Sequence, residues 1–367
     1  MELIFISHGS QKDKNAYSYR IDKFKDYFIK YTDFKACTIY LKDSFFGSPS
    51  LLQPLCGLSL IKKINTSEVV YAGNTPAAYS LGLMKKFIRR PIIYDVHGDI
   101  VQEYYLLKKN KFNPIHNYLI FQSKIMEFVA KKTADYFITC SGPLKQYYID
   151  QGIDADKIEI IRNGVDITLF KPFNTRFKNN KFVVTYAGAF QKWQGIENLI
   201  NAAKMVDSSD VVFKIIGFSD VDLSLKKSIK SVLGDAVQLI DILPHSELIK
   251  HLNDSDLLII PRNNHPAINM AMPTKFAEYI SMGKPVIVTR VDETADFVEK
   301  YDCGFVCDPN PESIADMIIK AKNISNEILF TKGKNARRLA EIEFDQKIIN
   351  ERYYQFMKKI LSEKRNT

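Results

Sequence analysis

The residues with the clearest chemical potential stand in one segment, PTKFAEYISMGKPVIV (273–288). Pro273 favours the first turn of a helix, because its ring fixes φ and it has no N–H to lose. The N–H groups of Thr274, Lys275 and Phe276 would then point unpaired out of the helix, and the Lys275 ammonium would add a full positive charge. This arrangement predicts a binding site for a diphosphate.

Glu278 lies one helical turn beyond Thr274 and Lys275. A carboxylate beside a diphosphate would be repelled, whereas one that accepts hydrogen bonds from ribose hydroxyls would be stabilised, so we expect Glu278 to bind a ribose. The alternative is an ordinary helix-surface pair between Glu278 and Lys275, worth about 0.2–0.5 kcal/mol. Gly283 is expected to end this helix.

A histidine stands at the tip of another expected strand, in the sequence DVHG. His97 could there hydrogen-bond a sugar hydroxyl or support a leaving oxygen, although a lone histidine is more often structural. Asp95 could orient its surroundings and is given no catalytic role.

The chain that must position these residues alternates β-rich runs with helical patterns, which is typical of parallel sheets in α/β proteins. Strands are expected at 2–7, 35–40, 68–73, 90–98, 133–141, 182–188, 210–217, 236–241, 256–262, 284–290 and 304–309. Helices are expected at 112–132, 196–205, 223–233, from a cap at Ser246, after Pro273 and at 344–361. Residues 263–272 are expected to be too polar and broken for a helix.

The length of 367 residues favours two domains. The stretch 171–181, KPFNTRFKNNK, is polar and basic, has no apolar period and resembles an interdomain linker. We therefore expect a first domain at 1–170, a second at 171–343, and a terminal helix, 344–367, that returns to the first.

The net charge of +9 is unevenly distributed: residues 1–132 hold 20 Lys and Arg against 11 Asp and Glu, so the remainder is neutral. This asymmetry indicates that the first domain meets something anionic, such as a membrane face, a phosphorylated lipid or nucleic acid, although a solvated surface is an equal alternative. No apolar run approaches the roughly 20 residues that span a bilayer, and MELIFISHGS lacks the layout of a signal peptide. A cytoplasmic protein, peripheral on the inner membrane face, is expected.

These motifs resemble the glycosyltransferases of family 4, a retaining group with the GT-B fold. The family's E-x-x-x-x-G-x-P-V-I pattern is matched from Glu278 to Ile287, and its N-G-V-D-x-x-x-F-x-P pattern by RNGVDITLFKP (162–172). FVVTYAGAFQKWQGIENLI (182–200) resembles its phosphate loop, and IIYDVHG (92–98) its histidine loop. The resemblance implies an α/β protein of two Rossmann-like domains facing a central cleft.

From the loops that follow the strands of the second domain and from this resemblance, we expect donor contacts from Gly188, Lys192, Gly217, Arg262, Asn269, Pro273, Thr274, Lys275 and Glu278. The resemblance implies catalytic roles for His97 and Lys275, and we expect acceptor contacts from Asn74, Tyr104 and the 8–15 loop. The family's phosphate-loop Arg and Lys would align with Ala189 and Gln194, so we expect Arg262 and Lys275 to clamp the diphosphate, with Lys192 as a weaker candidate.

A further departure concerns the donor sugar. Many members of the family carry a glutamate where this chain has Met270. In those members it is thought to face the sugar, so its role could pass here to the backbone N–H groups of 269–271 or to the Asn269 amide.

The implied activity is that of a retaining hexosyltransferase (EC 2.4) that moves a sugar from a UDP- or GDP-sugar to a glycan or lipid-linked acceptor, in cell-surface polysaccharide or lipopolysaccharide synthesis. Front-face displacement is expected, with no cofactor and no metal, because no DxD-type pair or His/Asp cluster is seen. A sugar-nucleotide epimerase of the GT-B fold would share the donor pocket and stays an alternative.

Two other classes are less favoured. A basic nucleic-acid-binding protein lacks support from a stacking aromatic motif or a helix-turn-helix, so no nucleic acid is expected as a partner. An NAD-dependent enzyme would need a G-x-G-x-x-G motif after its first strand, and neither Gly9 nor Gly188 begins one.

Overall fold

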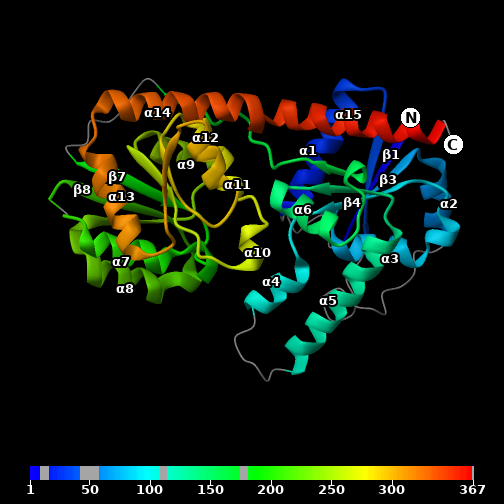
Figure 1. The fold of residues 1–367 in the computed structure, drawn as a ribbon, viewed down its shortest axis with the longest axis horizontal. Coiled ribbons are helices and arrows are strands. Elements are labelled where there is room, and N and C mark those ends of the chain that lie inside the picture. The colour runs from blue at the N-terminus through cyan, green and yellow to red at the C-terminus, as the bar shows by residue number, and fades with distance from the viewer. Residues whose placement is uncertain (9–15, 42–57, 108–113, 174–180, 208, 366–367) are drawn as a thin grey trace. The chain divides into compact units, whose positions relative to one another are not determined.

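The computed structural model describes residues 1–8, 16–41, 58–107, 114–173, 181–207 and 209–365. The chain forms two compact units, the first made of residues 1–162 and 349–367 and the second of residues 163–348. Each unit is drawn in Figure 1 and is described here by itself. The expected boundaries were at 170/171 and 343/344. The observed ones differ because Val165 and Phe170 are buried in the core of the second unit.

The first unit, unit 1, is a six-stranded parallel sheet in the order β2-β1-β3-β4-β5-β6. Its strands are β1 (Glu2–His8), β2 (Lys35–Leu41), β3 (Val69–Ala72), β4 (Ile92–Val96), β5 (Tyr136–Thr139) and β6 (Ile158–Ile160). Its helices are α1 (Ala16–Tyr31), α2 (Leu58–Thr66), α3 (Thr75–Leu83), η1 (Lys85–Phe87), α4 (Ile100–Leu107), α5 (Pro114–Thr133), α6 (Gly142–Asp150) and η2 (Ala155–Lys157).

The last helix, α15 (Gln346–Arg365), begins in the second unit and continues into the first. Its apolar side chains, among them Tyr353, Met357 and Ile360, join α1 and the sheet in the core of unit 1. The prediction of a returning terminal helix is therefore confirmed.

The second unit, unit 2, has a parallel sheet in the order β12-β11-β10-β7-β8-β9. Its strands are β7 (Phe182–Ala187), β8 (Val211–Phe218), β9 (Val237–Asp241), β10 (Leu257–Ile260), β11 (Val286–Thr289) and β12 (Gly304–Cys307). Its α-helices are α7 (Ile196–Met205), α8 (Leu223–Leu233), α9 (His245–Asn253), α10 (Pro266–Asn269), α11 (Thr274–Ser281), α12 (Thr294–Lys300), α13 (Pro311–Asn323) and α14 (Asn326–Leu339). Shorter helical turns are η3 (Lys192–Gln194), η4 (Asp220–Asp222), η5 (Gly234–Ala236) and η6 (Ala340–Phe344).

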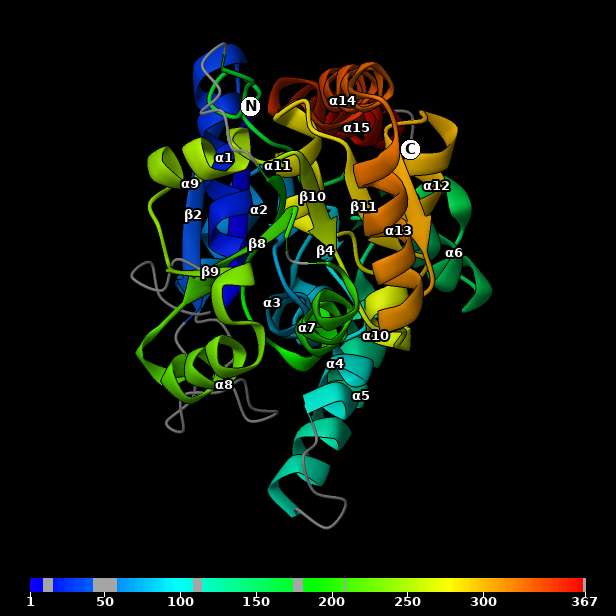
Figure 2. The same cartoon turned by 90° about the vertical axis from the view of Figure 1, so that its left-hand side faces the viewer.

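Helices cover both faces of the unit 2 sheet, and each face has its own apolar core. One core joins α7, α8 and α13, and the other joins α9, α11, α12 and α14. In Figure 2, α11 and α14 lie above the sheet, and α7 and α8 lie below it. Burial on both faces explains why the strands read as continuous apolar runs in the sequence.

The expected strands are confirmed, and two local expectations are wrong. Residues 263–272 contain a one-turn helix, α10, because His265 caps it by accepting the Ala267 N–H at 3.2 Å. Ser246 is not a cap, since α9 already begins at His245 with Pro244 in the cap position. Most of the expected linker, residues 174–180, lies outside the described residues. None of the described helices is both long and apolar enough to cross a bilayer.

Candidate functional site

The strand order of unit 2 reverses between β7 and β10, which are hydrogen-bonded neighbours. The loops that follow these two strands therefore leave the same edge of the sheet in opposite directions, and ligands of open α/β sheets bind at such a point. The predicted donor segments 188–195 and 262–278 begin at the ends of these two strands.

Three glycines allow the loops at this edge to pack closely. At Gly195, φ is +73° and an added Cβ would lie 1.6 Å from the Pro261 carbonyl oxygen, so no side chain fits. Gly217 has φ +126°, and its Cβ would lie 2.4 Å from the carbonyl oxygen of Gly188. The backbones after β7 and at the end of β8 are therefore in direct contact, and a ligand at this edge would meet peptide groups.

Tyr279 fixes helix α11 to the end of strand β7. The Tyr279 hydroxyl accepts the Ala187 N–H at 2.7 Å and donates to the Ala187 carbonyl at 3.0 Å. The Phe276 N–H donates to the Pro273 carbonyl at 3.1 Å, so the prediction that it is available to an anion is wrong. The N–H groups of Thr274 and Lys275 make no hydrogen bond to any described residue.

Lys275 places its ammonium directly under the loop that follows β7. Its Nζ lies 3.0 Å from Gln194 Oε1, 3.1 Å from the Tyr186 hydroxyl and 4.3 Å from the centre of the Tyr186 ring. A Cβ on Gly188 would lie 2.6 Å from this nitrogen. Burial lowers the pKa of Lys275 to about 7, with a further lowering from the charge of Arg262 and an opposing effect from Glu278.

Arg262 is buried beside the same loop and is neutralised by a carboxylate. Its Nη1 donates to the Ala271 carbonyl at 2.9 Å and forms an ion pair with Asp292. Its Nε has no hydrogen-bond partner among the described residues. Arg262, one of the two residues predicted to clamp the diphosphate, is thus paired with a carboxylate. It retains one N–H that could donate to a ligand.

The remaining predicted donor contacts differ in their surroundings. Lys192 is exposed in η3, and its carbonyl accepts from the Asn263 amide at 2.8 Å. The Asn269 N–H donates to His265 and that of Ala271 to Ile268, so neither is available to a sugar. If the Asn269 amide is turned over, its nitrogen donates to the carbonyl oxygens of His265 and Val291 at 2.9 Å. Glu278 is half-buried on α11.

In unit 1, His97 follows β4 and contacts a buried carboxylate. Its Nε2 lies 3.2 Å from Asp95 Oδ2, which also accepts from Arg20 Nε at 2.8 Å and from the Tyr71 hydroxyl. Although burial opposes ionisation, Arg20 and His97 hold the pKa of Asp95 well below its usual range. Arg20 also donates to the Ile161 carbonyl at 2.7 Å. The Asp95 carboxylate therefore fixes the orientation of the imidazole.

Sequence comparison connects both sets of residues with one enzyme family. Residues 168–339 match the family model described as glycosyl transferases group 1, and residues 44–169 match the one described as glycosyltransferase family 4. The chain belongs to this glycosyltransferase family. It is an enzyme of the hexosyltransferase type.

Relatives and solved structures agree with this assignment. CapM, a capsular polysaccharide biosynthesis glycosyltransferase of Staphylococcus aureus, is 26% identical over 79% of this chain and 78% of CapM. An Escherichia coli UDP-Gal:α-D-GlcNAc-diphosphoundecaprenol α-1,3-galactosyltransferase is 24% identical over 82% and 80% of the two chains. The structure of Anabaena HepE with UDP-glucose has a TM-score of 0.72 at 20% identity, over 98% of this chain and 100% of HepE, which shows the GT-B fold.

The predicted acceptor residues of the glycosyltransferase lie in unit 1. Asn74 caps α3 by accepting the Ala77 N–H at 3.0 Å, and its amide nitrogen lies 3.3 Å from the Ser7 hydroxyl. Tyr104 is on α4, with its ring 6.2 Å from that of His116. Residues 9–15 of the predicted 8–15 loop lie outside the described residues. The acceptor roles of these residues stay predictions.

Four residues of the two sites were missed from the sequence. Tyr186 and Gln194 surround the Lys275 ammonium, and Arg20 holds Asp95. Glu103 of α4 packs against Gly98, and burial, with the charge of Asp99, raises its pKa to about 7. The signal for Glu103 was its place one turn into the helix after the histidine loop, and that for Gln194 was its alignment with the family's phosphate-loop lysine. Tyr186 and Arg20 had no local signal.

Proposed function

We propose that this glycosyltransferase transfers a sugar from a UDP-sugar, with retention of anomeric configuration, to a lipid-linked acceptor in polysaccharide synthesis. The observation that carries the donor half is the arrangement around Lys275. Its ammonium lies under Gly188, and the N–H groups of Thr274 and Lys275 and the Arg262 Nε have no hydrogen-bond partner among the described residues. The similarity to the galactosyltransferase, which acts on GlcNAc-diphosphoundecaprenol, supports a lipid-linked acceptor, and the similarity to CapM supports a role in polysaccharide synthesis.

In the proposed reaction, negative charge develops on the diphosphate as it leaves the sugar. The acceptor hydroxyl oxygen forms a bond to the anomeric carbon as the bond from that carbon to the diphosphate breaks, and a diphosphate oxygen takes the hydroxyl proton. The Lys275 ammonium and the amides of Thr274 and Lys275 stabilise the negative charge on the departing diphosphate. Glu278 accepts hydrogen bonds from the ribose, and His97 supports the sugar.

Retention by front-face displacement is favoured by the state of the nearby carboxylate. Asp292 is paired with Arg262 and also accepts the Thr294 N–H at 2.9 Å, so it is not placed as a nucleophile. Comparing the anomeric proton couplings of the donor and of the product by NMR tests this point. An inverted product would overturn the retaining mechanism while leaving the transferase activity in place.

Donor binding is tested by thermal shift with UDP, GDP, ADP and CMP and their sugars, because a ligand of the native state raises the melting temperature by mass action. We expect uridine nucleotides to stabilise unit 2, and a flat response to all of them would contradict the proposal. Metal independence is part of the proposal: turnover with a working donor should persist in EDTA. Conversion of the UDP-sugar to its epimer without any acceptor would favour the epimerase alternative.

A further inference from the structure

Helix α5 has an apolar face that is exposed and that none of the described residues of unit 1 covers. Tyr118, Phe121 and Phe128 are 50%, 57% and 60% exposed, and Ile125 lies between them. Spacings of three, four and three residues place these side chains on one face of the helix. The opposite face, which includes Ile120, Met126 and Ala130, is buried, so α5 is apolar on two sides although only one is used by the fold.

The neighbouring helix continues this surface. Tyr105 of α4 is also exposed, and the Lys124 ammonium of α5 lies 5.8 Å from the centre of its ring. The two helices pack together, and α5 projects from the body of unit 1 (Figure 1). Because α4 begins three residues after His97, the Tyr105 end of this surface follows the histidine directly along the chain.

The charges on this pair of helices are sorted by sign. The carboxylates point inward: Asp99 caps α4 by accepting the Val101 N–H at 2.8 Å, Glu103 packs against Gly98, and Glu127 is buried. The exposed charged residues described on α5 are cations, Lys124 and Lys132. The outer surface of α4 and α5 is therefore aromatic and positive.

We infer that this surface, formed by Tyr105, Tyr118, Phe121, Lys124, Phe128 and Lys132, docks on an anionic lipid bilayer. Aromatic side chains with an apolar body and lysines around them are the residues that bind at the level of lipid headgroups. A protein partner would have to offer its own acidic surface, whereas a bilayer with anionic lipids supplies both an apolar layer and negative charge. The inference rests on the proposed function in one respect: docking would bring unit 1, which carries His97, to a lipid-linked acceptor.

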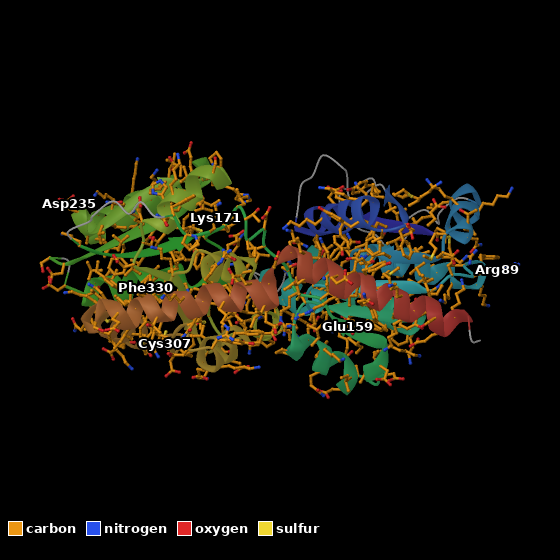
Figure 3. All side chains as sticks on the ribbon, turned by 90° about the horizontal axis from the view of Figure 1, so that it is seen from above. Arg89, Glu159, Lys171, Asp235, Cys307 and Phe330 are labelled. Atoms are coloured by element: carbon orange, nitrogen blue, oxygen red, sulfur yellow. The ribbon has the colours of Figure 1, made fainter. Side chains whose placement is uncertain are left out.

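Vesicle flotation of the full chain without any donor tests docking separately from catalysis. We expect binding to vesicles of phosphatidylcholine mixed with phosphatidylglycerol, and at least tenfold weaker binding of a variant carrying both F121S and F128S. The matched control is Phe330→Ser, because Phe330 of α14, labelled in Figure 3, is 64% exposed in unit 2. This variant should bind vesicles as the parent does.

A second pair of variants tests the contribution of positive charge to vesicle binding. Lys124→Glu should weaken binding to the anionic vesicles by about fivefold or more, since each lysine near such a surface contributes about 1 kcal/mol. Lys227→Glu, on an exposed lysine of α8, should change it little.

Two results would overturn the inference. One is vesicle binding that F121S with F128S does not reduce. The other is a parent chain that does not bind vesicles, sediments as a dimer, and becomes a monomer when Phe121 and Phe128 are both replaced by serine. That result would make the surface an interface between copies of the chain. Because UDP-dependent thermal shifts are measured on the same variants, a failed donor site is distinguished from a failed docking surface.

Discussion

Replacing Lys275 by Met tests the donor site most directly. The pKa of the Lys275 ammonium is lowered from 10.5 to about 7, first by burial and then by Arg262. A bound diphosphate would place two negative phosphates beside it, and we expect these charges to return the pKa to near its ordinary value. The free enzyme therefore binds a proton together with the donor at every pH between about 7 and 10.

The magnitude follows from the shift. At pH 8, one unit above the pKa, about one free molecule in eleven carries the charge, so donor affinity should be about tenfold weaker than at pH 6 and should fall about tenfold per further unit. A pKa that rises from about 7 to about 10 on binding corresponds to about three units, or about 4 kcal/mol. Lys275→Met should thus weaken donor binding by up to about 1000-fold at pH 6 and by about tenfold less at pH 8.

Isothermal titration calorimetry with UDP-glucose measures both effects, since the phosphates of this diester do not titrate between pH 6 and 8. Titrations at pH 8 in buffers of different ionisation enthalpy should give an uptake of about 0.9 proton by the parent, from the same pKa. The uptake should disappear in Lys275→Met and persist in Lys192→Met, which removes the exposed lysine of the same loop. No uptake by the parent, or equal losses of affinity at both pH values, would refute the reasoning.

The remaining predictions concern stability and the histidine. The raised pKa of Glu103 makes its ionisation in the folded state destabilising. As pH rises from about 4.5 to 7, the Glu103→Gln variant should therefore become more stable than the parent, by about 1–2 kcal/mol once the shift is reduced for screening by solvent. Melting temperatures of the two proteins should diverge across this range, and parallel curves would contradict the prediction. Arg20→Met and Asp95→Asn should each cost about 3–5 kcal/mol in denaturant unfolding, and the double variant less than their sum, because each single change leaves a buried charge unpaired. Gly195→Ala should abolish donor binding or folding of unit 2, whereas Gly234→Ala, at φ +52° with no atom within 4 Å of an added Cβ, should cost about 1–3 kcal/mol through backbone strain alone.

The sequence predicted those elements whose signal is local. The bounds of α7 and α8 agree with expectation because their apolar residues recur at helical spacing, and the start of α11 was indicated by Pro273. The loop contacts at the donor site were not predictable in the same way, since Lys275 is 89 positions from Tyr186 and 81 from Gln194 in the sequence. A propensity for helix or strand says nothing about which polar groups meet across such distances.

Arg20 and Arg262 show the same limit for charges. An arginine on an amphipathic helix such as α1 is expected to lie on the surface. Arg20 is instead buried, because it pairs with Asp95 of β4. The sequence does not reveal this pair, since the two residues are 75 positions apart. Arg262 was expected to be a free cation, but Asp292, 30 residues further along, neutralises it. The sequence indicates that a charge exists, whereas only the fold decides whether it is available.

The two units therefore use positive charge in different ways. In unit 2 the arginine at the donor site is paired with Asp292 and the pKa of Lys275 is near neutrality, so the site carries little net charge until an anion enters. This avoids the cost of holding two unpaired cations at one buried point. In unit 1, Asp95 neutralises the buried Arg20, while lysines such as Lys124 and Lys132 are exposed. The excess of +9 in residues 1–132 is then better explained by a charged partner outside the protein than by the diphosphate of the donor.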